Sequence, residues 1–392
     1  MYPPHHLGGY ELVWRSAMRH LRERGHDVRV LTTDFALSGG TSEPEDDGDH
    51  RELRWWWHDH AFPRRSPRER WAIERHNAAV IERHLSDQRP DVVTWWSMGG
   101  MSLSLLERVR LCGIPALGFV HDDWLDYGPR VDQWLQLFTG PRRGRAAGPA
   151  AALLRTPTRV DLDRAARYLF VSERTRQRAR DAGRALPDSG IAHSGIDPAY
   201  IDPQPEQPWA WRLLYVGRID ERKGIGTAVE ALVHLPAEAT LTIVGDGDAP
   251  AERKLRADAE RLGVSGRLRR EPFRSRAELP HVYASSDVVV FPVVWEEPWG
   301  LVPLEAMALG RPVVATGRGG SAEYLRDGQN ALLFQAGDPR GLAAAVSRLA
   351  QDAGLRARLR DGGLDTAPLH TEDVFNDAVA REVERRRPGG GS

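Results

Sequence analysis

The sequence predicts an α/β protein built from two Rossmann-like domains with parallel sheets. Three observations support this fold class. The length of 392 residues suits two domains. Short apolar runs alternate with longer amphipathic stretches, as in βαβ units. A proline-rich stretch over residues 198–208 separates two such series, which predicts an exposed linker between the domains.

The N-terminal series covers residues 1–197. We expect a helix over residues 9–24, followed by strands at 27–32, 90–95, 115–120 and 167–171. Residues 38–52 are rich in glycine and acidic residues, which predicts a flexible loop, and residues 140–158 form a second segment of low predicted order. A helix over about 371–387 is expected to pack back on this domain.

The C-terminal series covers residues 209–370 and repeats the same rhythm more regularly. We expect strands at 211–217, 240–245, 287–292, 312–316 and 332–334. Helices are expected over 224–235, 250–262, 302–309 and 338–351.

The start of the chain departs from this pattern. A Rossmann-like domain opens with a buried strand, yet here Gly8-Gly9 and a helix arrive with no strand before them. Losing a central strand would expose apolar surface and unpaired backbone. We therefore favour a native start upstream of Met1 over a sheet that lacks this strand.

Composition narrows the class of protein. The formal net charge of −1 argues against nucleic-acid binding. Cys112 is the only cysteine, so no internal disulfide is expected and a reducing cytoplasm is the simplest location. No apolar run approaches the ~20 residues of a transmembrane helix. The N-terminus does not resemble a signal peptide.

The segment from Trp295 to Gly310 carries the strongest chemical signal. It follows an apolar strand and opens a helix. Gly300 allows the backbone to approach a ligand closely. The N–H groups of Leu301 and Val302 can receive a phosphate at the positive end of the helix. Glu305 suits ribose hydroxyls, and Glu297, eight positions earlier, suits sugar hydroxyls. The bland alternative is an amphipathic helix with an acidic residue near its start.

This segment resembles the Glu-x7-Glu signature of retaining glycosyltransferases with the GT-B fold, in family four. Trp299 stands where that family usually has phenylalanine. The resemblance implies two facing Rossmann-like domains with an interdomain cleft. It also implies that Gly217, Arg218 and Lys223 bind the donor diphosphate, with the two cations stabilising the leaving β-phosphate.

Other donor-side matches follow along the C-terminal half. Gly245 lies in a turn similar to the family's glycine turn after the second strand. Phe273 falls where the family places the nucleobase. Arg274 follows it where the family often has glycine, so the base stays open, with UDP or GDP favoured.

The N-terminal half resembles the family more thinly. Gly9 matches the glycine loop that faces the donor in the family, although a Gly-Gly pair is more often a simple turn. His121 ends the strand 115–120 and resembles the histidine beside the reacting sugar. A satisfied structural histidine is the alternative. Trp95-Trp96-Ser97-Met98 replaces a histidine that family members often show, which suggests a difference on the acceptor side.

The resemblance implies transfer of a sugar from a nucleotide-diphosphate sugar to an acceptor hydroxyl, with that donor as co-substrate and no cofactor. The acceptor stays open: lipid-linked carriers, oligosaccharides and natural products all fit. Two other functions stay open, namely a nucleotide-sugar 2-epimerase or phosphorylase and a non-catalytic nucleotide-sugar-binding protein on the same fold.

Two further features allow competing interpretations. Asp246-Gly247-Asp248 and the histidine pairs near residues 5 and 58 suggest metal ligands, but a glycine turn and loop histidines are the simpler interpretations, so we expect no metal. Aromatic and basic residues at 54–65 and 142–155 suggest peripheral contact with the inner membrane face or binding of an aromatic or anionic acceptor. Ordinary surface loops with some buried tryptophan are the simpler alternative.

Overall fold

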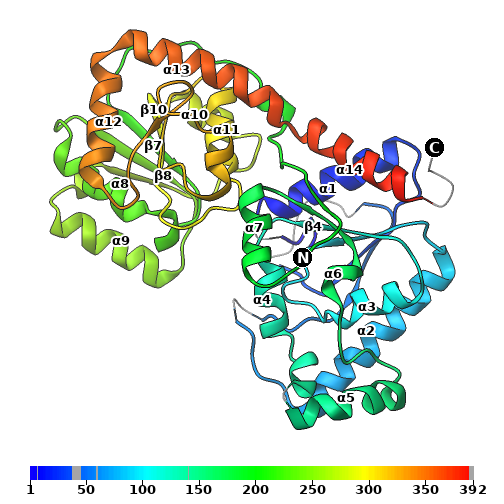
Figure 1. Ribbon diagram of the computed structural model, residues 1–392. Helices are drawn as coiled ribbons and strands as arrows, with labels where there is room; N and C mark the ends of the chain where they lie inside the picture. Colours follow the sequence, from blue (N-terminus) through cyan, green and yellow to red (C-terminus); the bar gives the residue numbers. More distant parts are fainter. Residues whose placement is uncertain (7, 38–45, 59–60, 140, 388–392) are drawn as a thin grey trace. The chain divides into compact units, whose positions relative to one another are not determined.

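The computed structural model describes residues 1–6, 8–37, 46–58, 61–139 and 141–387. They form two compact units (Figure 1). Unit 1 comprises Met1–His193 together with the chain from Phe375 onward, and unit 2 comprises Ser194–Val374. Residues 198–208, which the sequence predicts as a linker, therefore belong to unit 2.

Unit 1 contains two parallel sheets. One has the strand order β3-β4-β5-β6, and the other pairs β1 with β2. The described strands are β1 Val30–Thr33, β2 Asp49–Leu53, β3 Val93–Trp96, β4 Ala116–Val120, β5 Arg167–Phe170 and β6 Ser189–Ile191. The described helices are α1 Tyr10–Glu23, α2 Pro67–Gln88, α3 Ser104–Leu111, α4 Trp124–Val131, α5 Pro141–Leu154, α6 Leu162–Ala165, α7 Glu173–Asp181 and α14 Glu372–Arg386, the last of which begins at the end of unit 2.

Two segments of unit 1 are more ordered than the sequence predicts. Residues 49–52 of strand β2 fall in the stretch 38–52 that the sequence predicts to be a flexible loop. Residues 38–45 of that stretch lie outside the described residues. Strand β2 shows no apolar run in the sequence, because its outward side chains are polar. Glu52, for example, accepts a hydrogen bond from His84 at 3.1 Å and pairs with Arg83. Helix α5 occupies residues 141–154 of the stretch predicted to have low order, because its alanines favour helix despite two glycines.

The C-terminal helix α14 lies beside α1 (Figure 1). The Asn376 amide donates to Ser16 Oγ at 2.9 Å, and Arg24 pairs with Glu384 at 2.9 Å. Phe375 is buried against Trp96 and Phe119 of the sheet. Helix α14 is therefore part of the packing of unit 1.

Unit 2 is a six-stranded parallel sheet with helices around it. The strand order is β12-β11-β10-β7-β8-β9. The strands are β7 Arg212–Val216, β8 Thr240–Val244, β9 Leu268–Glu271, β10 Val288–Phe291, β11 Val313–Ala315 and β12 Leu332–Leu333. The helices are α8 Ile225–Ala231, α9 Ala249–Arg261, α10 Leu279–Ala284, α11 Leu301–Ala308, α12 Pro339–Gln351 and α13 Ala353–Thr366.

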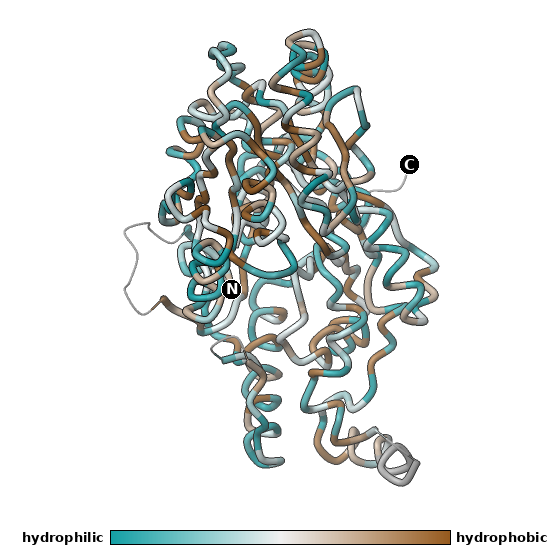
Figure 2. Tube along the Cα trace, turned by 90° about the vertical axis from the view of Figure 1, so that its left-hand side faces the viewer, coloured by the Kyte–Doolittle hydropathy of each residue, from teal (hydrophilic) through white to brown (hydrophobic). Residues whose placement is uncertain are grey.

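The apolar sequence runs form the cores of both units. All four residues of β10 are buried, as are all five of β4. Figure 2 shows apolar stretches running through the interior and hydrophilic residues on outer turns. Strands buried on both faces read as continuous apolar runs, which is why these elements are readable from the sequence.

Candidate active site

The candidate donor site lies at the switch point of the unit 2 sheet. From the middle of this sheet, β7, β8 and β9 follow one another in one direction, whereas β10, β11 and β12 follow in the other. Open parallel sheets bind ligands at such a point, beyond the carboxyl ends of the strands. The loop after β7 carries Lys223, and the loop after β10 carries Glu297.

Lys223 and Glu297 meet at this point. Lys223 Nζ donates to Glu297 Oε2 at 2.7 Å, and Trp295 Nε1 donates to the same oxygen at 2.7 Å. The two side chains of the ion pair are only 21% and 11% exposed, so solvent screens them weakly. Within the described part of the chain, no hydrogen bond engages Oε1. Glu297 therefore keeps one carboxylate oxygen for a ligand hydroxyl.

Two glycines allow the loops to approach this closely. Gly224 has φ 70°, and a Cβ there would lie 1.8 Å from the Pro292 carbonyl oxygen at the end of β10. Gly319 also has φ 70°, and its Cβ would lie 2.2 Å from the Glu297 carbonyl oxygen. That oxygen accepts a hydrogen bond from the Gly320 N–H at 2.7 Å. Larger residues at 224 or 319 would push Lys223 and Glu297 apart.

Helix α11 begins beside the ion pair. Gly300 precedes it with φ 88° and no side-chain cap, so no capping side chain takes the first N–H groups, at Leu301 and Val302. The Tyr324 hydroxyl donates to the Gly300 carbonyl and holds this turn. The uncapped, positive end of the helix suits a phosphate group.

Trp299 and Glu305 flank the start of this helix. The Trp299 ring is buried and packs edge-on against Tyr324 and His370, with centroids 5.0 and 5.3 Å apart, so it supports the loop from the core side. Glu305 Oε2 accepts a hydrogen bond from the Tyr283 hydroxyl at 2.5 Å. Burial raises the pKa of the Glu305 carboxyl, and the Tyr283 hydrogen bond opposes that rise.

The remaining donor-side residues lie on exposed loops or close turns of unit 2. Gly217 follows β7 and its N–H donates to the Val244 carbonyl at 2.9 Å, which brings it beside Gly245 at the end of β8. Arg218 is exposed, and no ion pair engages it among the described residues. Phe273 follows β9 and its side chain is 69% exposed.

His121 follows β4 in unit 1 and sits among aromatic rings. Its ring centroid is 4.7 Å from that of Tyr10, 5.6 Å from that of Phe375 and 6.3 Å from that of Trp96. Both ring nitrogens are buried without a hydrogen-bond partner in the described structure. Burial lowers the pKa of His121 to about 3, so the imidazole is neutral. These unpartnered nitrogens favour a ligand-facing histidine over a satisfied structural one.

Gly9 lies just before α1 in the same unit. It is exposed, and a Cβ added there would meet no atom within 4 Å. Packing therefore does not require a glycine at this position, and Gly9 stands at the N-cap of α1, where glycine is common.

Sequence reasoning missed two groups of the site. Tyr283, on α10, carries no motif signal, and its link to Glu305 depends on how α10 and α11 pack. Trp295 stands inside the recognised segment, but its hydrogen bond to Glu297 could be found only by asking which donor a buried carboxylate would need.

The structure gives several candidate metal ligands other partners. Asp248 caps α9 by accepting from the Ala251 N–H at 2.8 Å, which explains the acidic turn. One histidine–carboxylate group of the described residues could geometrically hold a metal: His50, Glu52 and His84. However, His84 Nδ1 contacts Arg29 at 3.2 Å, its Nε2 contacts Glu52, and Arg83 pairs with Glu52. The positive charges of Arg29 and Arg83 disfavour a metal cation here. Both ring nitrogens of His84 are also already engaged.

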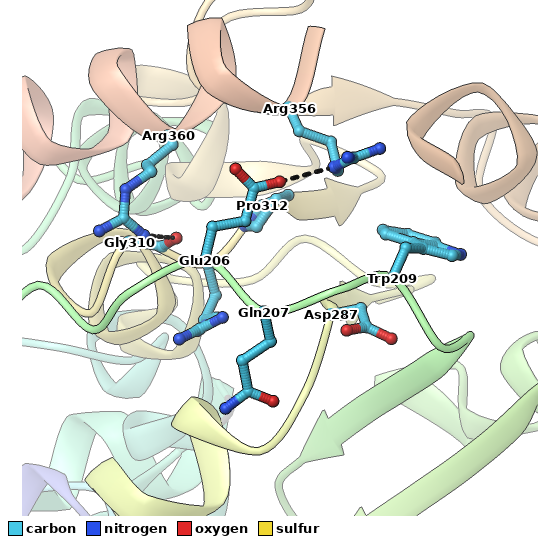
Figure 3. Close-up of a pocket in the computed structure, with 9 residues that line it drawn as sticks. Glu206, Gln207, Trp209, Asp287, Gly310, Pro312, Arg356 and Arg360 are labelled. Carbon is cyan, nitrogen blue, oxygen red and sulfur yellow. Dashed lines mark hydrogen bonds and ion pairs between the residues drawn. The ribbon is translucent and has the colours of Figure 1, made fainter. Parts of the chain in front are cut away.

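A small hollow in unit 2 is structural. It has a volume of about 20 Å³, room for a water or two. Figure 3 shows its lining residues, with Glu206 paired to Arg356 at 2.8 Å and Arg360 donating to the Gly310 carbonyl at 2.7 Å. The first contact fastens the proline-rich stretch to helix α13, and the second fastens the turn after α11 to the same helix.

The aromatic and basic stretches at 54–65 and 142–155 are only partly exposed on the surface. Trp56 is fully buried, and Trp55 and Trp57 pack on each other and on Phe35. Leu153 at the end of α5 is 84% exposed, whereas the side chains of residues 141–146 and all of His60 lie outside the described structure. Across the described helices, none combines the length and apolar character needed to cross a membrane.

Comparison with known families agrees with this geometry. A model described as "Glycosyltransferase Family 4" matches residues 7–200, and one described as "Glycosyl transferases group 1" matches residues 210–352. The chain belongs to glycosyltransferase family 4. Both units are matched, so the family covers the candidate donor site and His121 alike.

Curated relatives match a smaller part of the chain. It is 37% identical over 183 residues to D-inositol 3-phosphate glycosyltransferase of Xylanimonas cellulosilytica, covering 44% of this chain and 44% of that protein. It is 37% identical over 172 residues to the lipopolysaccharide core biosynthesis glycosyltransferase LpsE of Rhizobium meliloti, covering 44% and 48%. The chain thus spans less than half the length of these relatives.

Solved structures share the GT-B fold. WaaG, a glycosyltransferase involved in lipopolysaccharide biosynthesis, matches with a TM-score of 0.66 and 21% identity, covering 97% of each chain. HepE of Anabaena, solved in complex with UDP-glucose, matches with a TM-score of 0.60 and 20% identity, covering 79% of this chain and 82% of that one. At these identities the likeness shows the fold alone.

Proposed function

We propose that this family 4 protein is a retaining glycosyltransferase that moves a sugar from a nucleotide-diphosphate sugar to an acceptor hydroxyl. The observation that carries the proposal is the Lys223–Glu297 ion pair at the switch point of unit 2, next to the uncapped start of α11. The start of α11 presents positive charge to a diphosphate, and Glu297 presents a carboxylate oxygen to a sugar hydroxyl.

The chemistry follows from these groups. The bond between the anomeric carbon and the β-phosphate oxygen breaks, and the nucleotide diphosphate leaves with its electron pair. Arg218, Lys223 and the N-terminus of α11 stabilise the charge that develops on it. The acceptor oxygen bonds to the same face of the anomeric carbon, and its proton passes to the leaving phosphate oxygen. Retention of configuration and independence of metal rest on the family resemblance.

The donor proposed is a UDP- or GDP-sugar. Exposed Phe273 offers an aromatic face to a base, and Glu305 offers a carboxylate to a ribose hydroxyl. A UDP-sugar is supported by HepE, whose structure holds UDP-glucose. The acceptor class is a hydroxyl compound, and inositol 3-phosphate is the first to try because several relatives are named for it.

The first experiment identifies the donor. A panel of UDP-, GDP- and dTDP-sugars is screened by thermal shift, because a ligand that binds the folded state raises Tm with its affinity. The best donor is then incubated alone and with inositol 3-phosphate or other acceptors. Mass spectrometry follows product, and NMR reads its anomeric configuration. Transfer only with acceptor supports the proposal, epimerised donor without acceptor identifies an epimerase, and binding without turnover identifies a binding protein.

A matched pair of variants tests the carboxylate. Glu297→Gln should reduce transfer at least about 100-fold, since one preorganised polar contact to a transition state contributes about 3 kcal/mol. Glu296→Gln is the control: it is the adjacent glutamate, it pairs with Arg318 at 2.7 Å, and its loss should leave transfer within about threefold. Equal activity of Glu297→Gln and wild type would refute the assignment.

A further inference from the structure

The loop between β9 and α10 carries the exposed side chain of Phe273. Arg274 makes local ion pairs in this loop, with Glu271 at 3.2 Å and with Glu278 at 3.4 Å. These pairs join the loop to the ends of its own strand and helix, so they do not fix it against the rest of unit 2. Arg276, in contrast, reaches two segments that are far away in the sequence.

Arg276 is held through both its side chain and its backbone. Its Nη1 donates to Glu372 Oε1 at 2.5 Å, and its carbonyl oxygen accepts a hydrogen bond from the Tyr200 hydroxyl at 3.2 Å. The side chains of Arg276 and Glu372 are 28% and 8% exposed, so solvent screens this ion pair weakly. Tyr200 is buried. We call these two contacts the Arg276 anchor.

The partners of the Arg276 anchor lie on two segments that are themselves fastened together. The Glu372 N–H donates to the Ile196 carbonyl at 2.7 Å. Gly195 lies so close to Thr371 that a Cβ added to it would be 1.9 Å from the Thr371 carbonyl carbon. These segments carry the chain into and out of unit 2. The Arg276 anchor therefore ties the loop to hydrogen-bonded backbone, which is a firmer support than a single surface side chain.

The same contacts lead to the carboxylate proposed for the ribose. The Tyr200 ring packs edge-on against Tyr283, with centroids 6.4 Å apart, and the Tyr283 hydroxyl donates to Glu305 Oε2 at 2.5 Å. Burial raises the pKa of the Glu305 carboxyl, and the Tyr283 hydrogen bond opposes that rise. The charge of Arg276 also lowers this pKa, whereas the charge of Glu372 raises it. The Arg276 anchor is thus close enough to Glu305 to act on it.

We propose that Arg276 is a positioning residue for the nucleoside part of the donor. The inference rests on the proposed function, in which Phe273 meets the base and Glu305 meets a ribose hydroxyl. A nucleotide holds its base and its ribose at a nearly fixed separation, so Phe273 and Glu305 must be held at a matching one. The Arg276 anchor holds the loop in place before the donor arrives, which avoids the entropic cost of ordering it on binding.

The diphosphate part of the donor does not depend on this anchor. Its proposed ligands are Arg218, Lys223 and the start of α11, which lie on other loops. Loss of the Arg276 anchor should therefore weaken binding of a nucleotide and leave binding of inorganic diphosphate unchanged. A general structural defect of unit 2 would weaken both.

The experiment measures affinities for UDP, GDP and inorganic diphosphate by calorimetry. Arg276→Met keeps an aliphatic side chain but loses the ion pair, so affinity for the nucleotide that the wild type prefers should fall about tenfold. Affinity for inorganic diphosphate should stay within about twofold. Arg276→Lys keeps the charge opposite Glu372 and should recover nucleotide affinity to within about threefold of wild type. Arg274→Met is the control, because Arg274 lies in the same loop but its ion pairs are local.

A second variant separates positioning from folding. Arg276→Met leaves Glu372 buried without its ion-pair partner, which costs stability. Arg276→Met/Glu372→Gln removes the unpaired charge, and circular dichroism and Tm report whether it folds like wild type. The double variant should show the same loss of nucleotide affinity as Arg276→Met.

Three results would overturn the positioning role of Arg276. They are an unchanged nucleotide affinity in Arg276→Met, an equal loss of inorganic diphosphate affinity, and an equal loss of nucleotide affinity in Arg274→Met. A wild type that binds neither UDP nor GDP would contradict the proposed function instead. The two ideas can therefore fail separately.

Discussion

Glu74 on α2 is a buried acid whose charge should control the stability of unit 1. It is 1% exposed, and its Oε2 accepts a hydrogen bond from Ser104 Oγ at 2.6 Å. Its Oε1 has no partner within the described structure. Burial, aided by the negative charge of Asp132, raises the pKa of Glu74 from 4.5 to about 8.

The sign and size of the effect follow from linkage. Between pH 4.5 and 8 the folded state keeps a proton that the unfolded state releases, so the free energy of unfolding falls as pH rises. The slope is about 1.4 kcal/mol per pH unit, which totals about 5 kcal/mol across the window. Below pH 4.5 and above pH 8 the contribution of Glu74 is constant. Glu74→Gln removes this titration.

The assay is thermal unfolding followed by circular dichroism at pH 5, 6, 7 and 8. Relative to wild type, the Tm of Glu74→Gln should rise progressively, with the difference between pH 5 and 8 on the order of 10 °C. Asp87→Asn is the control, because Asp87 lies on the same helix but is exposed. Parallel Tm curves for wild type and Glu74→Gln would show that Glu74 is ionised in the folded protein and refute the reasoning.

Four further predictions concern the site. Arg218→Ala should weaken binding of the nucleotide diphosphate about tenfold in calorimetry, since a charge-assisted hydrogen bond contributes about 1.5–3 kcal/mol, and unchanged affinity would contradict the phosphate-site assignment. Tyr283→Phe should weaken donor binding about fivefold through the freed Glu305 carboxylate, while affinity for inorganic diphosphate stays constant. His121→Phe should lower kcat/KM at least about tenfold with Tm nearly unchanged, because the phenyl ring still fills the space among the aromatic side chains. In the wild type, kcat/KM should show no titration of His121 between pH 5 and 8, because its pKa is about 3. Chelation by EDTA should leave transfer unchanged, and a loss restored by a divalent cation would contradict the metal-independent mechanism.

The positions of the central strands were predictable, for a physical reason, whereas most helices of unit 1 were not predicted. Central parallel strands are apolar on both faces and stand out as runs, so β4, β7, β8 and β10 lie within a residue or two of their predicted positions. Strand β2 was not predictable in this way. It is polar outward, and its place depends on pairing with β1 and on charges from α2, which are tertiary contacts.

The same distinction between local sequence signals and tertiary contacts applies to the site. The roles of Arg218 and Lys223 were predicted from the family resemblance. Those of Glu297 and Glu305 were predicted from the motif around the start of α11, and all four roles stay predictions. The hydrogen bonds of Trp295 and Tyr283 were not predicted, because each depends on which loops and helices meet in space. The local sequence determines which groups a segment offers, whereas the strand order of the sheet determines which other segments it contacts.

The preformed Lys223–Glu297 ion pair also suggests that Lys223 and Arg218 have different roles. Glu297 already balances Lys223, and Trp295 completes the hydrogen bonding at the shared oxygen, so this constellation needs little rearrangement when a donor arrives. The unbalanced positive charge for a diphosphate therefore comes mainly from exposed Arg218 and the start of α11. From this we infer that Arg218→Ala acts mainly on donor affinity. Glu297→Gln, which disturbs the alignment of sugar and phosphate, acts mainly on kcat.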